Sequence, residues 1–176
     1  MAAEGGCDRR VPNIAGMNIR ISRADPARAM DLHRLLEDYF TALAIVQRDT
    51  VEDIASSLAA PGESSWLAEV DGAPAGCVAL REVQVPGLPA GTTRECKRLY
   101  VRPEFRGLGI AARLLDAMER HGAATGIEWI YLDSKDDLEA ALRLYAERGY
   151  RVCERYNDNP QATVFMRKRL AAGPGA

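Results

Sequence analysis

The sequence predicts an α+β domain with a mixed, mainly antiparallel central sheet of about seven strands, flanked by about four helices. Several short runs alternate polar and apolar residues, which is typical of half-buried strands. The pair Asp71-Gly72 separates two of these runs and is a strong signal for a tight antiparallel hairpin. One long segment with helical spacing separates two later runs, so the strands on its two sides are expected to be parallel.

The chain is long enough for one folded domain. It has 176 residues, and 47% of them are hydrophobic, which supports one core but not two large ones. We expect the domain to span residues 17–170. Residues 1–16 lack periodicity and are expected to form a disordered leader, with a flexible tail at residues 171–176. Whether Met1 or Met17 is the native start stays open.

Charge and hydropathy exclude two classes of partner. Lys and Arg number 23 and Asp and Glu number 25, giving a formal net charge of −2. The chain therefore lacks the basic excess of a nucleic-acid binder. No apolar run reaches membrane-spanning length and the start lacks a secretory signal, so we expect a cytoplasmic protein with no membrane partner.

The four cysteines, Cys7, Cys77, Cys96 and Cys153, are far apart in the sequence. They form no C-x-x-C pair and no metal-ligand spacing. We expect free, reduced thiols, three of them in strands. No metal site is predicted.

The first three elements are expected to be a strand and two helices. Residues 18–23 alternate polar and apolar side chains as a half-buried strand does. Asp25 followed by Pro26 is typical of a helix start, and Thr50 with Asp53 resembles a capping arrangement for a second helix. The apolar stripes expected to be buried are Met30, Leu35, Leu36, Tyr39, Phe40 and Leu43 in the first helix, and Val51, Ile54, Ala55 and Leu58 in the second.

The hairpin follows, with strands at residues 65–70 and 74–82. Residues 85–93 are rich in proline and glycine and are expected to form an exposed loop. The next strand is expected at residues 96–101. Pro103 is expected to stop any helix from forming directly after it.

The rest of the domain alternates helices and strands. A helix is expected over residues 107–122, followed by a strand at residues 128–133 that runs parallel to the preceding one. Asp136 or Asp137 is expected to cap the next helix, which Gly149 ends. The last two strands are expected at residues 150–155 and 162–170, joined by a polar loop.

Residues 95–115 carry the strongest functional signal. The helix that begins here leaves its first N–H groups without partners inside the helix. Gly107 and Gly109 lack a Cβ, so a bulky anion can come close to those groups, and the helix dipole favours negative charge there. Arg106 adds a permanent positive charge. These features predict a pocket for a phosphate or pyrophosphate.

Two phosphate-binding patterns fit this turn. Gly107, Gly109 and Ala112 match G-x-G-x-x-A, the dinucleotide fingerprint. That fingerprint should follow a strand at once and be followed by further βα units, whereas residues 102–106 intervene here. Alternatively, Arg106, Gly109 and Ala111 form R-x-x-G-x-A. After the strand and loop of residues 97–103, this pattern resembles the acyl-CoA-binding motif of the GNAT superfamily of N-acyltransferases.

The resemblance covers residues 17–170 and is strongest over residues 95–150. It implies the three-layer GNAT fold. Residues 133–150 resemble the second GNAT motif, with Ala141, Leu144-Tyr145 and Gly149-Tyr150 at its characteristic positions. One departure is Leu138, which stands where many members carry asparagine. A hydrogen bond to the cofactor arm is therefore in doubt.

The resemblance implies acetyl-CoA as the cosubstrate and no metal. The diphosphate would lie on the N–H groups of residues 106–111, and the pantetheine arm would pair with the backbone of residues 99–101 as a strand does. The implied cofactor-binding residues are Leu99, Tyr100, Val101, Arg106, Gly107, Leu108, Gly109, Ile110 and Ala111.

The resemblance also implies the chemistry. Glu95 lies at the offset from Arg106 where histone-type members carry a catalytic glutamate, so it is the expected base for an attacking amine. Tyr145 matches the tyrosine that protonates the leaving thiolate. Some relatives use water chains to a more distant acid, which leaves Glu69 as an alternative base.

The acceptor is expected to be a small-molecule amine or a protein amino group. Tyr39 and residues 156–159 are expected to border its site. A homodimer is expected only by analogy with other members. The alternative function is a non-catalytic acyl-CoA-binding or sensing domain, but the presence of both Glu95 and Tyr145 favours an enzyme. A nicotinamide-dinucleotide-binding module is the third reading, weakened by the loop before the glycines and the missing βα units.

Overall fold

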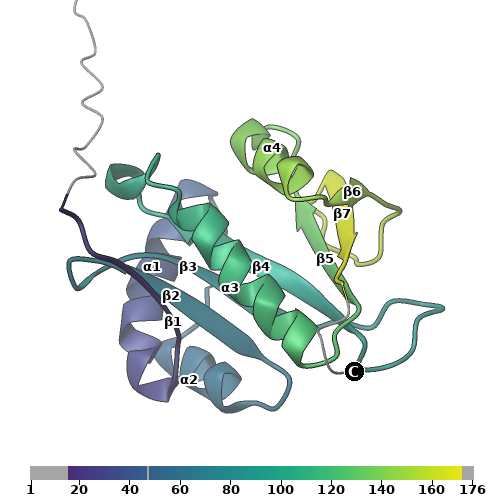
Figure 1. Ribbon diagram of the computed structural model, residues 1–176, viewed down its shortest axis with the longest axis horizontal. Coiled ribbons are helices and arrows are strands. Elements are labelled where there is room, and N and C mark those ends of the chain that lie inside the picture. Colours follow the sequence, from purple (N-terminus) through teal and green to yellow (C-terminus); the bar gives the residue numbers. More distant parts are fainter. Residues whose placement is uncertain (1–15, 47, 172–176) are drawn as a thin grey trace, which may run out of the picture.

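The computed structural model describes residues 16–46 and 48–171 (Figure 1). The leader was expected at residues 1–16 and the tail at residues 171–176. Of these, only residues 16 and 171 are among the described residues, and Cys7 lies outside them. The thiols of Cys77, Cys96 and Cys153 are free. No helix in the described part of the chain is long and apolar enough to cross a membrane.

The described elements form one sheet with helices on both faces. The strands are β1 (Ile19–Arg23), β2 (Ser64–Val70), β3 (Ala73–Glu82), β4 (Thr93–Val101), β5 (Trp129–Ser134), β6 (Arg151–Val152) and β7 (Val164–Arg169). The helices are α1 (Ala29–Ala42), α2 (Val51–Ala59), α3 (Ile110–Ala124) and α4 (Glu139–Glu147), with 3₁₀ turns η1 (Pro26–Arg28) and η2 (Pro103–Phe105).

The strand order in the sheet is β1-β2-β3-β4-β5-β7-β6. Every neighbouring pair is antiparallel except β4 and β5, which are parallel because α3 forms the crossover between them. The architecture confirms the predicted fold class, including the parallel pair.

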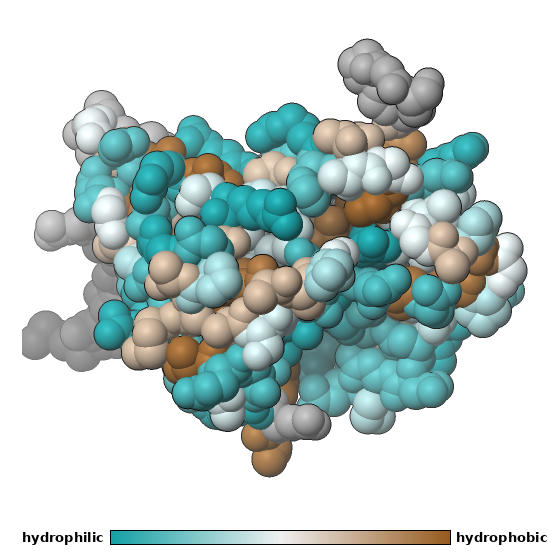
Figure 2. Space-filling view, turned by 90° about the horizontal axis from the view of Figure 1, so that it is seen from below, coloured by the Kyte–Doolittle hydropathy of each residue, from teal (hydrophilic) through white to brown (hydrophobic). Residues whose placement is uncertain are grey.

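Strand alternation divides the apolar side chains between two cores. Trp66 and Val78 point to the face covered by α3 and α4, while their neighbours Leu67 and Cys77 point to the face covered by α1 and α2. In Figure 1, α3 crosses the β2–β4 part of the sheet, and α4 lies with β5–β7 at the other side. The domain therefore has three layers. The face seen in Figure 2 is mostly hydrophilic, with apolar side chains in small separate patches.

Both expected caps in the first half are confirmed. Asp25 accepts a hydrogen bond from the N–H of Ala27, and Thr50 and Asp53 form a reciprocal capping box. The buried stripe of α1 is partly wrong, because Met30 is 49% exposed and Leu32 is buried instead. The helical period explains the difference: Leu32 lies three residues before Leu35 and shares its face, whereas Met30 lies five residues before Leu35 and falls on another face.

Three expectations about residues 103–155 are wrong. A 3₁₀ turn does form at Pro103, which occupies its first position, where a missing N–H has no consequence. Neither Asp136 nor Asp137 caps α4, because Leu138 is the N-cap residue and makes no side-chain cap; Asp136 exchanges hydrogen bonds with Thr163 in a loop far along the chain. β6 is two residues long, much shorter than the strand expected at residues 150–155. Gly149 ends α4 with a positive φ of 88°, as predicted.

Candidate active site

The sheet opens between its two parallel strands. β4 and β5 pair only through Thr93 with Trp129, Arg94 with Ile130 and Glu95 with Tyr131. Beyond Glu95, in the described residues, β4 continues to Val101 with pairing to β3 but none recorded to β5. One edge of β4 is therefore available to an extended ligand from residue 96 onward.

A bulge bends β4 at this opening. The register with β3 shifts between Cys77 and Ala79, and Arg98 has a positive φ of 57°. An extra residue on one strand increases local twist and redirects side chains. The following residues approach β3 closely, since a Cβ on Gly76 would lie 2.6 Å from the carbonyl oxygen of Tyr100. Glycine at position 76 is thus required by packing.

A cavity of about 120 Å³ lies at the opening between β4 and β5. Cys96, Lys97 and Leu99 of β4 line one side, and Asp133 at the end of β5 lines the other. Its lining also includes Tyr39 of α1 and Leu138, Ala141 and Tyr145 of the α4 segment. The expected acceptor-site residue Tyr39 and the expected acid Tyr145 thus meet in one space. Glu95, Tyr100 and Val101 are not among the lining residues.

Tyr145 is held in the α3 and α4 core, and its ring stacks edge-on against Tyr150 at 5.7 Å between centroids. Burial raises the pKa of its phenol well above the ordinary value, and the nearby Cys96, Tyr39 and Asp133 raise it further. Tyr145 therefore carries its proton at neutral pH. A protonated phenol that lines a cavity can donate to an anion formed there.

The glycine turn before α3 has the geometry of an anion site. Gly107 and Gly109 have φ values of 82° and 72°, and a Cβ on either would meet nothing within 4 Å. Leu108 and Ile110 are buried and fix the turn to the core. Within the described residues, no hydrogen-bond partner is recorded for the backbone N–H groups of residues 107–111. These N–H groups can receive an anion at the positive end of the helix.

Arg106 has less free donor capacity than expected. Its backbone N–H donates to the carbonyl of Pro103 at 3.2 Å within the 3₁₀ turn. Its Nε donates to the carbonyl of Val101 at 3.1 Å. The N–H of residue 106 is therefore already used, and the anion site begins at Gly107. Arg106 instead ties the end of β4 to the turn.

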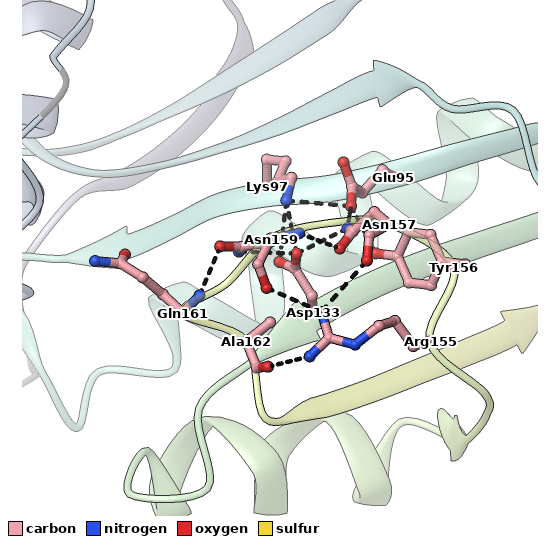
Figure 3. A network of polar contacts seen from close by, with 9 residues as sticks. All are labelled: Glu95, Lys97, Asp133, Arg155, Tyr156, Asn157, Asn159, Gln161 and Ala162. Carbon is pink, nitrogen blue, oxygen red and sulfur yellow. Dashed lines mark hydrogen bonds and ion pairs between the residues drawn. The ribbon is translucent and has the colours of Figure 1, made fainter.

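Glu95 lies in a polar network on the α1 and α2 face of the sheet (Figure 3). The residue is 8% exposed. Its Oε1 accepts hydrogen bonds from the Tyr156 hydroxyl at 2.6 Å and the Asn157 amide at 2.8 Å, and Lys97 Nζ lies 3.1 Å away. The β6–β7 loop (residues 153–163) therefore folds over Glu95. Residues 156 and 157, expected to border the acceptor, contact the expected base directly.

Asp133 shares two of these partners. Lys97 Nζ lies 3.0 Å from both of its oxygens, and the amides of Asn157 and Asn159 donate to its Oδ2. Burial raises the pKa of Asp133, but the hydrogen bond from Asn159, the charge of Lys97 and the bond from Asn157 outweigh it and hold the pKa below its ordinary value. Lys97 thus joins two carboxylates at the rim of the cavity.

Glu69 is held in a separate set of ion pairs. It is buried, receives hydrogen bonds from Arg20 and Arg28, and is not among the residues that line the cavity. Its role is an ion-paired contact between β2, β1 and η1. Glu69, the alternative base suggested by the sequence, is therefore neutralised by two arginines and contacts none of the residues around Glu95.

Sequence reasoning missed Lys97 and Asp133 as site residues. Lys97 was visible two positions after Glu95, hence on the same face of the strand. Asp133 ends a strand predicted to be parallel to β4, which is a position where functional side chains gather. Asn159 belongs to residues 156–159, which the sequence places at the border of the acceptor site, but no local signal predicts its hydrogen bond to Asp133, because that contact depends on the conformation of a loop. In the described part of the chain, no group of three or more His, Cys, Asp or Glu side chains could hold a metal ion.

Comparisons with known proteins agree with this geometry. Residues 29–150 match the family model of the acetyltransferase (GNAT) family. An uncharacterized N-acetyltransferase of Schizosaccharomyces pombe is 37% identical over 97 residues, which cover 54% of this chain and 56% of that protein. The chain thus spans about half the length of this relative.

Solved structures share the fold at lower identity. An N-acetyltransferase from Staphylococcus aureus Mu50 has a TM-score of 0.73 and 18% identity, covering 88% of this chain and 99% of that one. The PaiA N-acetyltransferase of Thermoplasma acidophilum, solved with coenzyme A, has a TM-score of 0.69 and 17% identity, covering 86% and 99%. The family model spans most of the domain, including the opened sheet and the glycine turn. The chain belongs to the acetyltransferase (GNAT) family.

Proposed function

We propose that this protein transfers an acetyl group from acetyl-CoA to a primary amine by direct attack. The observation that carries the proposal is the opening between β4 and β5, which holds a cavity lined by Tyr145 along the open edge of β4. The glycine turn suited to an anion follows the end of the same strand in the chain. The acceptor would be a small molecule or a protein amino group. The free thiols of Cys77, Cys96 and Cys153 suit a reducing compartment such as the cytoplasm.

The residues present fit coenzyme A. The N–H groups of residues 107–111 would hold the diphosphate, because they are unengaged in the described structure and lie at the positive end of α3. The open edge of β4 from Cys96 to Val101 would hold the amide-bearing arm. The PaiA enzyme, which has the same fold, binds coenzyme A. Acetyl-CoA would supply the acetyl group as a thioester, activated for attack by an amine.

Glu95 would serve as the base. A lysine-like amine is protonated at neutral pH, and freeing its lone pair costs about 4 kcal/mol. A carboxylate beside the amine accepts that proton and lowers the barrier. Because Tyr156, Asn157 and Lys97 all lie at Oε1, the second oxygen of Glu95 has no recorded partner among the described residues. This oxygen would receive the proton.

Tyr145 would serve as the acid. As the amine nitrogen bonds to the acetyl carbon, the carbon–sulfur bond breaks and the sulfur leaves with the electron pair. The phenol of Tyr145 lines the cavity and carries its proton at neutral pH. It can therefore protonate the leaving thiolate, which balances the proton taken up by Glu95.

The proposal is tested by two measurements on the purified chain. Calorimetry should detect binding of acetyl-CoA and none of NAD, since the loop at residues 102–106 disfavours a dinucleotide site. Thiol release over a panel of small amines and peptides should depend on the amine. Binding of acetyl-CoA without release of thiol for any amine would leave the non-catalytic domain as the function. Binding of NAD alone would overturn the proposal.

A further inference from the structure

Arg81 and Glu95 are directly opposite each other on β3 and β4 but do not form an ion pair. Residues in register on antiparallel strands point to the same face, with Cβ atoms about 4.5–5.5 Å apart. Glu95 turns instead toward Tyr156, Asn157 and Lys97. A cation and a carboxylate therefore lie side by side on the same face of the sheet.

Arg81 is half-buried, and no ion pair or side-chain hydrogen bond is recorded for it within the described residues. Its Nε is buried and makes no hydrogen bond within the described residues. Burial lowers the pKa of Arg81, and the neighbouring charge of Arg98 lowers it further. A buried N–H group without a hydrogen-bond partner is rare in proteins because leaving it unpaired is costly. Such a group calls for an explanation.

The carboxylates near Arg81 are engaged elsewhere. Those close enough to act on its charge are Glu63, Asp49 and Glu95. Glu63 accepts a hydrogen bond from the Ser57 hydroxyl, and Asp49 forms an ion pair with Arg98. Arg81 is thus the cation of this cluster that remains without an anion among the described residues.

Arg81 and Arg98 line a small cavity of about 20 Å³ between the sheet and helices α1 and α2. Ser57 and Ser65 add hydroxyl groups to its lining. Arg98 also lines the larger cavity that contains Tyr145 and Lys97, so the two cavities share this side chain as a wall. The small cavity has room for about one or two water-sized groups, which suits the oxygens of a carboxylate better than a phosphate.

We propose that Arg81, together with Arg98, forms a subsite for the carboxylate of the acceptor, and that the acceptor is an amino-acid-like molecule with an amine beside a carboxylate. The inference rests on the proposed function, because it places the amine on the side of Glu95. An α-amino acid carries both groups on one carbon. Its ammonium group would face Glu95 and its carboxylate would face Arg81, which matches the order of charges across β3 and β4.

The test compares ligands that differ only in the carboxylate. Calorimetry on the full chain saturated with coenzyme A, which cannot react, measures the Kd of each α-amino acid and of its α-amide. We expect the tightest-binding amino acid to bind about 10–100-fold more tightly than its amide. Equal binding of acids and amides, or no binding by any amino acid, would overturn the inference.

Arg81→Met is the critical variant, because it removes the charged guanidinium group and keeps an unbranched side chain of similar shape to the aliphatic part of arginine. We expect the preference for the acid to fall to roughly twofold or less in the variant. Its melting temperature without acceptor should equal or exceed that of the wild type, since an unpartnered cation is lost. A variant that keeps the full preference, or that melts far below the wild type, would contradict the assignment.

Arg94→Met is the matched control. Arg94 lies on β4 next to Glu95, but its side chain donates to the carbonyls of Gly62 and Gly91 and lines neither cavity. The preference for the acid should be unchanged in this variant. Thiol release with simple amines separates the two proposals: release without a preference for carboxylates rejects the subsite alone, and selective binding without release rejects the transfer reaction alone.

Discussion

The phenol hydroxyl of Tyr156 donates a 2.6 Å hydrogen bond to Oε1 of Glu95, although the two residues are 61 positions apart in the chain. The contact joins the β6–β7 loop to the central strand. The Tyr156 ring also packs edge-on against Tyr131 and Phe165, at 5.0 and 5.7 Å between centroids. The expected base is thus held by a loop whose position depends on aromatic packing.

Replacing Tyr156 with phenylalanine should keep this packing and remove the hydrogen bond. We expect the free energy of unfolding to fall by about 1.5–3 kcal/mol, because the bond is to a carboxylate with little solvent exposure. Chemical denaturation measures the change. Tyr131→Phe is the control: its hydroxyl accepts a 3.3 Å bond from the exposed Arg167, so a smaller loss is expected. Equal losses in the two variants would contradict the account.

Replacing Tyr145 with phenylalanine should lower kcat more than it raises the KM for acetyl-CoA. The reason is that the phenol donates its proton only after the carbon–sulfur bond begins to break, so its loss affects the transition state. A decrease in kcat of about 10²-fold or more is expected. Steady-state thiol release checks this. Tyr150→Phe, which alters the adjacent ring outside the cavity lining, should leave kcat unchanged. An unchanged kcat in Tyr145→Phe would remove that residue from the acid role.

Replacing Gly109 with alanine should weaken coenzyme A binding. The substitution places a Cβ at a positive φ of 72° beside the N–H groups of α3, which costs about 1–2 kcal/mol in strain and obstructs the diphosphate. Gly126→Ala is the matched control, since Gly126 has a φ of 79° and equally open surroundings in the turn after α3. Both variants should lose similar stability, but only Gly109→Ala should raise the calorimetric Kd. An equal rise in the Kd for coenzyme A in both variants would refute the location of the diphosphate site at the start of α3.

Replacing Asp133 with asparagine should give a pH-dependent loss of stability. The pKa of Asp133 is lower in the folded protein than its ordinary value of 3.8. The ionised form therefore stabilises the fold above pH 3.8, and this contribution is lost as the pH falls through the lower folded-state pKa. The difference in unfolding free energy between wild type and variant should be largest near neutral pH and shrink in acid. Denaturation at several pH values measures it, and a constant difference would speak against the network.

Local signals predicted much of the fold. The capping box of Thr50 and Asp53 and the glycine start of α3 depend on residues within one turn of each other, so the sequence displays them directly. The parallel β4–β5 pair followed from the length of the intervening segment. These features need no information about distant contacts.

The errors arose where distant contacts or irregular turns decide the structure. Asp136 forms hydrogen bonds with Thr163 rather than capping α4. Met30 is a different case, because its spacing from Leu35 already places it off the buried face of α1. The bulge at Arg98 carries no glycine or asparagine to signal its positive φ. The network of Lys97 and Asp133 joins different strands and a loop, and only the folded chain brings these side chains together.

The central claim is that Glu95 serves acetyl transfer to an amine at this site, and thiol release by the wild type and Glu95→Gln tests it most directly. The glutamine keeps an oxygen for the bond from Tyr156 but cannot accept a proton. We predict amine-dependent release by the wild type, a kcat about 10²–10⁴-fold lower in Glu95→Gln, and an unchanged Kd for coenzyme A. Equal kcat values for the two proteins, or no amine-dependent release by the wild type, would contradict the account.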